Sequence, residues 1–239
     1  MNILCVIPSR IASTRLPRKP LLLIQGKPMI QWVYERASQC KLLTNIVVAT
    51  DSEEIATLIK SIGGKVEMTD AAIPTGSERA AEVATRYPNA EVVINLQGDE
   101  PFIKPDMLEK LVAPYLAGES PEMTTLATPL LPDDINNPGA VKVITDLHHN
   151  AIYFSRAPIP FYRTNHKAPV YHHMGLYAFR RDFLLHYKTL AQTPLELAES
   201  LEQLRVLENG YKIRVCLTSE KTLEINTPEE LERAQSFPL

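Results

Sequence analysis

The chain has 239 residues, enough for one large domain or two small ones with a sizeable core. Its formal net charge is −3, so we expect no nucleic-acid partner, and any basic character must be local. No apolar run reaches the ~18 residues that span a bilayer, no secretory signal opens the chain, and 3 scattered cysteines give no disulfide framework, which predicts a cytoplasmic protein without membrane insertion.

Strand and helix patterns alternate through the first half of the chain. We predict strands at residues 3–7, 45–50, 65–69 and 92–96, and helices at residues 29–38, 52–62 and 77–86. The strands at 45–50 and 92–96 contain continuous apolar runs, which are typical of a sheet covered on both faces. The fold class is therefore α/β, with a doubly wound, mainly parallel, Rossmann-like sheet.

The second half of the chain is less regular. We predict helices at residues 105–117, 181–190, 194–208 and 228–235, and strands at residues 124–128, 141–145, 172–179 and 213–217. No internal repeat, low-complexity linker or break in composition divides the chain. We therefore expect a single domain, residues 1–239, with an inserted smaller lobe around residues 130–180.

A basic loop, PSRIASTRLPRKP at residues 8–20, directly follows the first strand. It holds four cations and no acid. A loop at the carboxyl end of the first strand lies where open α/β sheets bind ligands, and guanidinium groups match phosphate oxygens in pairs. The alternative is a solvated surface loop, but the interleaved prolines stiffen the segment. The loop therefore predicts a polyphosphate site.

The fourth predicted strand runs into QGDEP at residues 97–101, so Asp99 leaves the same sheet edge as the basic loop. A carboxylate facing a polyphosphate is placed to hold Mg²⁺, which takes carboxylate and phosphate oxygens. An ion pair from Asp99 to Arg10 or Lys19 is the alternative, and Glu100 is equally consistent with a structural role. These residues alone leave both interpretations open.

Several common site motifs are absent from the sequence. It contains neither the P-loop pattern nor the dinucleotide G-x-G-x-x-G pattern, and no G-x-S-x-G nucleophile elbow. His172 and His173 are adjacent on a predicted strand, so their side chains point to opposite faces and we expect no shared metal ion.

Five segments resemble the 3-deoxy-manno-octulosonate (Kdo) cytidylyltransferase family, the CMP-Kdo synthetases. They are the basic loop, TGSER (75–79), QGDEP (97–101), FSRAPIP (154–160) and LEQLR (201–205). NPGAVK (137–142) and MGLY (174–177) lie between them and add to the likeness. The resemblance runs in order along nearly the whole chain.

The resemblance implies transfer of CMP from CTP to the anomeric 2-hydroxyl of Kdo, with release of pyrophosphate, Mg²⁺ as cofactor and a role in lipopolysaccharide synthesis. It implies that the triphosphate is held by Arg10, Arg15 and Lys19, and that Asp99 binds the metal. It further implies nucleotide contacts from Pro8, Ser9, Thr75, Gly76, Ser77 and Gln97, and sugar-acid contacts from Arg156, His173, Tyr177, Glu202 and Gln203. A homodimer formed through the inserted lobe is also implied.

Two positions depart from the family pattern. Asn226 stands where the family usually has an aspartate that is a second magnesium ligand, and its amide oxygen lacks the charge that attracts a divalent cation. Arg18 stands where a glycine is usual, which either adds a phosphate contact or restricts a loop that needs glycine's freedom. Three alternatives therefore stay open: an amino-substituted Kdo, another 2-keto sugar acid, or a degenerate paralogue that binds nucleotide or sugar acid without turnover.

Overall fold

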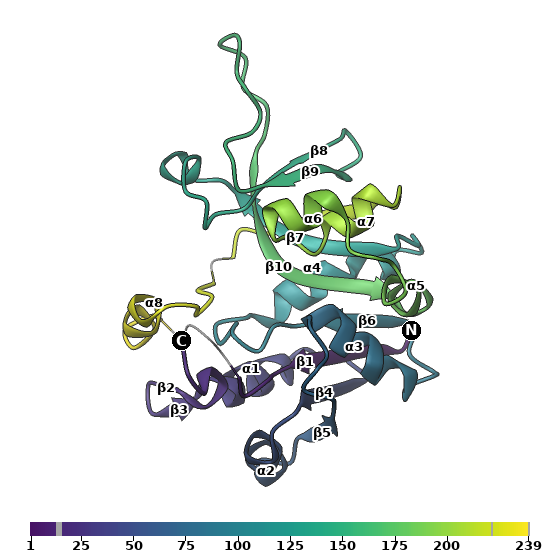
Figure 1. Ribbon diagram of the computed structural model, residues 1–239, viewed down its shortest axis with the longest axis vertical. Coiled ribbons are helices and arrows are strands. Elements are labelled where there is room, and N and C mark those ends of the chain that lie inside the picture. Colours follow the sequence, from purple (N-terminus) through teal and green to yellow (C-terminus); the bar gives the residue numbers. More distant parts are fainter. Residues whose placement is uncertain (13–15, 221, 239) are drawn as a thin grey trace. The chain divides into compact units, whose positions relative to one another are not determined.

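The computed structural model describes residues 1–12, 16–220 and 222–238. The chain divides into two compact units, the first formed by Met1–Glu109 with Lys221–Leu239 and the second by Lys110–Glu220 (Figure 1). Each unit contains its own pairs of strands and its own buried residues. Helix α4 (Pro105–Leu116) runs from the first unit into the second.

The first unit contains four parallel strands, which pair in the order β6-β1-β4-β5 (Figure 1). The strands are β1 (Ile3–Pro8), β4 (Asn45–Thr50), β5 (Lys65–Met68) and β6 (Val92–Asn95). The chain builds outward from β1 to β4 and β5, then returns to add β6 on the other side of β1. This reversal makes the β1–β6 edge a topological switch point, where ligands of such sheets bind. The predicted α/β fold class is confirmed.

Helices α1 (Met29–Ala37), α2 (Glu53–Ser61) and α3 (Gly76–Thr85) connect these strands, and α8 (Pro228–Ala234) follows near the end of the chain. Two of these helices, α2 and α3, begin at hydroxyl caps. Ser52 Oγ accepts from the Ile55 N–H, and Thr75 Oγ1 accepts from the Glu78 N–H. A short 3₁₀ turn, η1 (Lys19–Leu21), and a hairpin, β2 (Leu23–Ile24) with β3 (Lys27–Pro28), lie between β1 and α1. The sequence analysis did not predict this hairpin, whose strands are too short to carry a pattern.

The second unit is built around β7 (Met123–Pro129), which pairs in parallel with β11 (Ile213–Leu217) and antiparallel with β10 (Tyr171–Arg180). Strand β8 (Lys142–Thr145) pairs with β10, and β9 (Ala151–Ser155) pairs with β8. The remaining elements are η2 (Pro132–Asp134), α5 (Arg181–Tyr187), α6 (Pro194–Glu199) and α7 (Leu204–Glu208). Strand β9 was not predicted.

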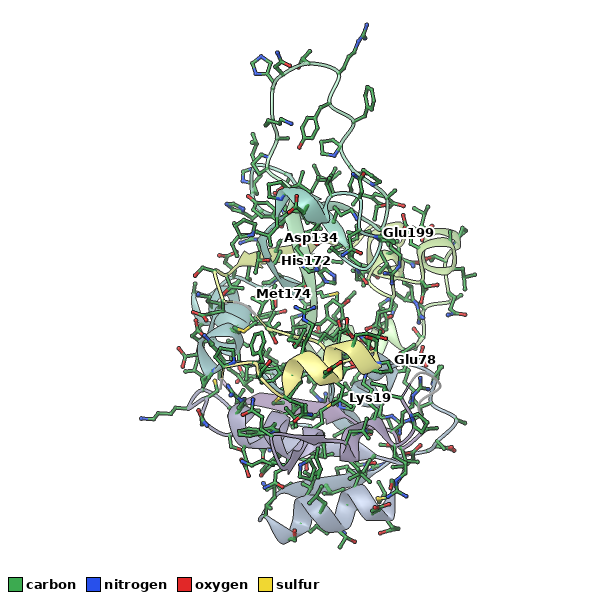
Figure 2. The ribbon with its side chains drawn as sticks, turned by 90° about the vertical axis from the view of Figure 1, so that its left-hand side faces the viewer. Lys19, Glu78, Asp134, His172, Met174 and Glu199 are labelled. Atoms are coloured by element: carbon green, nitrogen blue, oxygen red, sulfur yellow. The ribbon has the colours of Figure 1, made fainter. Side chains whose placement is uncertain are left out.

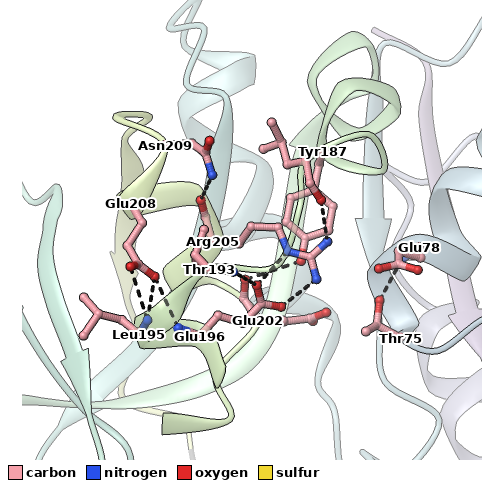
Figure 3. Close-up of polar contacts among 11 residues, drawn as sticks. Thr75, Glu78, Tyr187, Thr193, Leu195, Glu196, Glu202, Arg205, Glu208 and Asn209 are labelled. Carbon is pink, nitrogen blue, oxygen red and sulfur yellow. Dashed lines mark hydrogen bonds and ion pairs between the residues drawn. The ribbon is translucent and has the colours of Figure 1, made fainter. Parts of the chain in front are cut away.

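The predicted single helix at residues 194–208 is wrong, because α6 and α7 are separate helices. Ser200 lies between them in the left-handed region, with φ 52° and ψ 50°, which ends α6. Figure 3 shows what holds the two helices together: the buried guanidinium of Arg205 on α7 binds the carboxylate of Glu196 on α6, at 2.6 and 2.8 Å. In the described part of the chain, no helix has the length and apolar character to cross a bilayer.

Candidate functional site

A pocket with a volume of about 230 Å³ opens in the first unit, at the carboxyl ends of β1 and β6. It lies at the switch point of the sheet, as the position of the basic loop predicted. Its lining includes nine of the residues named from the sequence: Pro8, Ser9, Arg10, Lys19, Thr75, Gly76, Gln97, Asp99 and Asn226. They come from four separate stretches of the chain, which the fold brings to one place.

The remaining nucleotide-site predictions lie elsewhere. Ser77 is buried and does not line the pocket, and its Oγ accepts a hydrogen bond of 3.0 Å from Asn95 Nδ2. Arg15 lies outside the described residues. Arg79 also lines the pocket, and the sequence analysis assigned it no role although it ends the TGSER segment. Its buried guanidinium donates to Thr69 Oγ1 and thereby braces the loop that leads to Thr75.

Lys19, Asp99 and Asn226 form the polar centre of the pocket. The Lys19 ammonium (labelled in Figure 2) donates to Asp99 Oδ2 at 2.6 Å and to Asn226 Oδ1 at 2.9 Å. The side chains of Lys19 and Asp99 are only 14% and 20% exposed, so the charges interact with little screening. The ion pair between Asp99 and Lys19, which the sequence left open, is therefore present.

The same oxygens fit a hard divalent cation. Asp99 Oδ1 is buried and has no hydrogen-bond partner among the described residues, which leaves one carboxylate oxygen for a further ligand. Within the described ranges, no group of three or more histidine, cysteine, aspartate or glutamate side chains is arranged to hold a metal ion. A metal here would need oxygens from a bound ligand, as Mg²⁺ commonly takes from substrate phosphates.

Ser9 and Gly98 also line the pocket. The Ser9 N–H donates to Ala49 O at 2.8 Å, so this backbone donor is already used within the sheet. Its hydroxyl oxygen is buried and has no partner in the part of the chain that the structure describes. A Cβ atom on Gly98 would lie 2.8 Å from Pro8 O, so only glycine allows the ends of β1 and β6 to approach this closely.

Glu100 is a second acid beside the pocket but does not line it. Its carboxylate is buried, and Oε2 accepts a hydrogen bond of 2.7 Å from Thr222 Oγ1. Burial raises the pKa of Glu100 well above its usual value, and the nearby charges of Glu224 and Asp99 raise it further. The raised pKa favours the neutral form of Glu100, which is consistent with its structural role.

Arg18 does not line the pocket. Its backbone lies in the left-handed region, with φ 55° and ψ 32°, so the position does use the conformation that glycine adopts freely. The guanidinium pairs with Glu54 on α2, and the Arg18 side chain is 61% exposed. Of the two hypotheses for this position, the geometry favours a backbone effect over a phosphate contact.

The predicted sugar-acid residues lie in the second unit. Arg156 donates through Nε to Glu199 O and through Nη1 to Pro138 O, which fixes its guanidinium at the base of the loop after β9. Figure 2 labels His172 and Met174, the neighbours of His173 on β10. His173 is buried, and burial lowers its pKa to about 3, so the ring is neutral at physiological pH.

Tyr177 and Gln203 lie in contact with each other, and Glu202 precedes Gln203 in the turn between α6 and α7. The Tyr177 hydroxyl donates to Gln203 Oε1 at 3.1 Å, and Gln203 Nε2 lies 3.5 Å from His173 Nδ1. The backbone oxygen of Glu202 accepts from the Tyr187 hydroxyl at 3.4 Å (Figure 3). Arg205, in the same segment, donates to both carboxylate oxygens of Glu196.

Comparison with known proteins identifies the family. A sequence model of the cytidylyltransferase family matches residues 4–213. The 3-deoxy-manno-octulosonate cytidylyltransferase of Acaryochloris marina is 56% identical over 99% of this chain and 97% of its own. That of Synechococcus elongatus is 49% identical over 99% of this chain and 98% of its own.

A solved structure points to the same family. The structure of CMP:2-keto-3-deoxy-manno-octonic acid synthetase complexed with CTP superimposes with a TM-score of 0.94. It is 40% identical, and the alignment covers 99% of this chain and 98% of that one. Sequence and fold thus agree, and the chain belongs to the 3-deoxy-manno-octulosonate cytidylyltransferase family.

Proposed function

We propose that this protein transfers CMP from CTP to the anomeric 2-hydroxyl of Kdo and releases pyrophosphate. The observation that carries the proposal is the pocket at the β1–β6 switch point, where Arg10, Lys19 and Asp99 converge. Relatives that match nearly the whole chain are named for this activity, and a structural neighbour at 40% identity holds CTP. The family membership makes the other sugar acids and the inactive paralogue the less favoured alternatives.

In this proposal the basic loop binds the triphosphate. Arg10, Arg15 and Lys19 neutralise the phosphate oxygens, because phosphoryl-type transfer depends mainly on positioning and on charge stabilisation. The turn at Pro8 and Ser9 and the segment at residues 75–77 hold the cytosine. Since the Ser9 N–H already binds Ala49 O, the Ser9 hydroxyl is the donor left at that position for the nucleotide. Gln97 lines the same pocket and completes the nucleotide site.

Asp99 and Asn226 would hold Mg²⁺, with phosphate oxygens completing its coordination. Magnesium, when bound, supplies positive charge at the attacking and leaving oxygens. The oxygen of the anomeric hydroxyl forms a bond to the α-phosphorus while the bond from that phosphorus to the pyrophosphate oxygen breaks. The hydroxyl proton passes to water. Because the sugar hydroxyl displaces pyrophosphate directly, no covalent protein intermediate is required. Lys19 remains close to the departing phosphates and neutralises their charge.

Arg156, His173, Tyr177, Glu202 and Gln203 would bind the sugar acid. The Arg156 side chain carries a positive charge that suits the sugar carboxylate, and its two contacts to backbone oxygens fix its direction. The lobe around residues 130–180 would also carry the contacts of a homodimer. The protein would work in the cytoplasm.

Pyrophosphate release tests the proposal directly. The protein is mixed with CTP, Mg²⁺ and each of several 2-keto sugar acids, and we expect the fastest release with Kdo. Lys19→Ala and Asp99→Ala should each lower turnover by about a hundredfold or more while the fold is kept. Lys27→Ala is the matched control, because Lys27 pairs with Glu35 outside the pocket. Binding of CTP and Kdo without release, or near-normal rates in either pocket variant, would overturn the proposal.

A further inference from the structure

Four polar side chains in the second unit form a continuous buried chain: Thr125, His173, Gln203 and Tyr177. Thr125 Oγ1 lies 3.0 Å from His173 Nε2. On the other side of the ring, His173 Nδ1 lies 3.5 Å from Gln203 Nε2, and Gln203 Oε1 accepts from the Tyr177 hydroxyl at 3.1 Å. The four residues are at most 7% exposed, so these groups have one another as partners rather than bulk water.

Thr125 determines the direction of this chain of hydrogen bonds. Its hydroxyl oxygen also lies 2.9 Å from Leu176 O and 3.2 Å from Met174 O. Both carbonyls are acceptors only, and the hydroxyl has a single proton, so that proton goes to a carbonyl. The contact to His173 can then be a hydrogen bond only if His173 Nε2 carries the ring proton and donates it to Thr125.

The remaining contacts follow the same direction. With the proton on Nε2, His173 Nδ1 presents a lone pair, which accepts from the Gln203 amide nitrogen. Gln203 Oε1 then faces Tyr177 and accepts the proton of its hydroxyl. The His173 ring is held in place by Phe154, edge-on at 4.8 Å between ring centroids, and by Tyr177, stacked at 5.7 Å.

The backbone explains why Thr125 reaches two carbonyls of β10. The pairing of β10 with β7 shifts register between Met174 and Tyr177, which is the irregularity of a β-bulge. The Thr125 hydroxyl lies within hydrogen-bond distance of the carbonyls of Met174 and Leu176 in this irregular stretch. One side chain thus stabilises both the bulge and the ring that precedes it.

We propose that Thr125 is a positioning residue that fixes His173 in its Nε2–H tautomer and thereby orients Gln203 and Tyr177 for the sugar acid. The inference rests on the proposed function, which places these residues in the sugar-acid site. Because the Tyr177 proton is committed to Gln203, the phenol oxygen meets the substrate as an acceptor. It therefore suits a sugar hydroxyl, whereas the sugar carboxylate is left to Arg156.

The tautomer is measured by ¹⁵N NMR of the histidine ring nitrogens, using Thr125→Val, Thr125→Ser and the neighbouring Thr124→Val. Thr124 is an equally buried threonine whose hydroxyl donates to Leu111 O instead of contacting His173, so it controls for loss of a buried hydroxyl. We expect the Nε2–H signature in the unmodified protein, in Thr125→Ser and in Thr124→Val. Thr125→Val should lose it.

Kinetics give the second readout. Thr125→Val should raise the KM for the sugar acid about tenfold, the equivalent of one lost neutral hydrogen bond, and leave the KM for CTP unchanged. Thr125→Ser should restore the normal value. An Nδ1–H signature in the unmodified protein would overturn the proposal, as would equal effects of Thr125→Val and Thr124→Val. If Tyr177→Phe raises this KM while Thr125→Val does not, the positioning role is wrong and the proposed function stands.

Discussion

The Lys19 ammonium lies 2.6 Å from Asp99 Oδ2 and so neutralises the carboxylate that is the proposed metal ligand. The same ammonium donates to Asn226 Oδ1 at 2.9 Å, so both candidate metal ligands bind Lys19. A divalent cation and Lys19 would therefore compete for the negative charge of Asp99 and for the Asn226 amide oxygen. A triphosphate would remove the competition by drawing Lys19 to its own oxygens.

Replacing Lys19 should expose this competition. In Lys19→Met the Asp99 carboxylate keeps its place but loses its positive partner, so we expect Mn²⁺ to bind more tightly in the absence of nucleotide, by about tenfold or more. Electron paramagnetic resonance of free Mn²⁺ measures the affinity without turnover. Lys27→Met, which breaks the ion pair to Glu35 elsewhere, should leave it unchanged. Equal Mn²⁺ affinity in Lys19→Met and the unmodified protein would rule out the competition.

The neutral amide at position 226 should weaken metal binding. Asn226→Asp adds a negative charge beside Asp99, so we expect the Mg²⁺ concentration that supports half-maximal CTP binding to fall several-fold. Calorimetric titration of CTP at stepped Mg²⁺ concentrations provides the measurement, and titration without metal is the control. An unchanged Mg²⁺ requirement would place Asn226 outside the coordination shell.

The sheet of the first unit was predictable because its signals are local. Continuous apolar strands, the hydroxyl caps Ser52 and Thr75, and the basic loop after β1 all act within a few residues, and a parallel sheet brings its strand ends to one edge. The pocket therefore gathers most of the predicted nucleotide residues. Asn226 meets Lys19 across 207 positions of sequence, and its place there came only from the family resemblance.

The second unit was less predictable because its signals depend on tertiary contacts. Ser200 divides the predicted helix at 194–208 without any glycine or proline to mark the break, and the Arg205–Glu196 ion pair stabilises the two short helices. Thr125 looks like an ordinary β-branched strand residue. Its link to His173 requires the register of β7 against β10, including the shift before Tyr177.

The left-handed backbone at Arg18 should appear as a difference in stability between two variants with small side chains. Arg18→Gly and Arg18→Ala both lose the exposed pair to Glu54, but only alanine keeps the steric cost of a positive φ. We expect the glycine variant to have the larger free energy of unfolding, by about 1 kcal/mol, in urea denaturation. Thr57→Gly and Thr57→Ala are the control pair, because Thr57 is exposed within α2. There the glycine variant should have the smaller free energy of unfolding, by a similar amount. A more stable Arg18→Ala would contradict the left-handed conformation.

Burial of neutral His173 should make the fold less stable in acid. Burial lowers the pKa of His173 from 6.5 to about 3, with a smaller effect from His172, so between these values the unfolded chain binds a proton that the folded chain excludes. The free energy of unfolding should therefore fall as pH drops below 6.5, and His173 alone should contribute about 2 kcal/mol of loss between pH 7 and pH 5. Urea denaturation of the unmodified protein and of His173→Gln across this range isolates the effect. The difference between their free energies of unfolding should shrink toward acid. The exposed His166→Gln variant should keep the full pH dependence of the unmodified protein. A His173→Gln variant with the same pH dependence as the unmodified protein would show that the ring is protonated equally in both states.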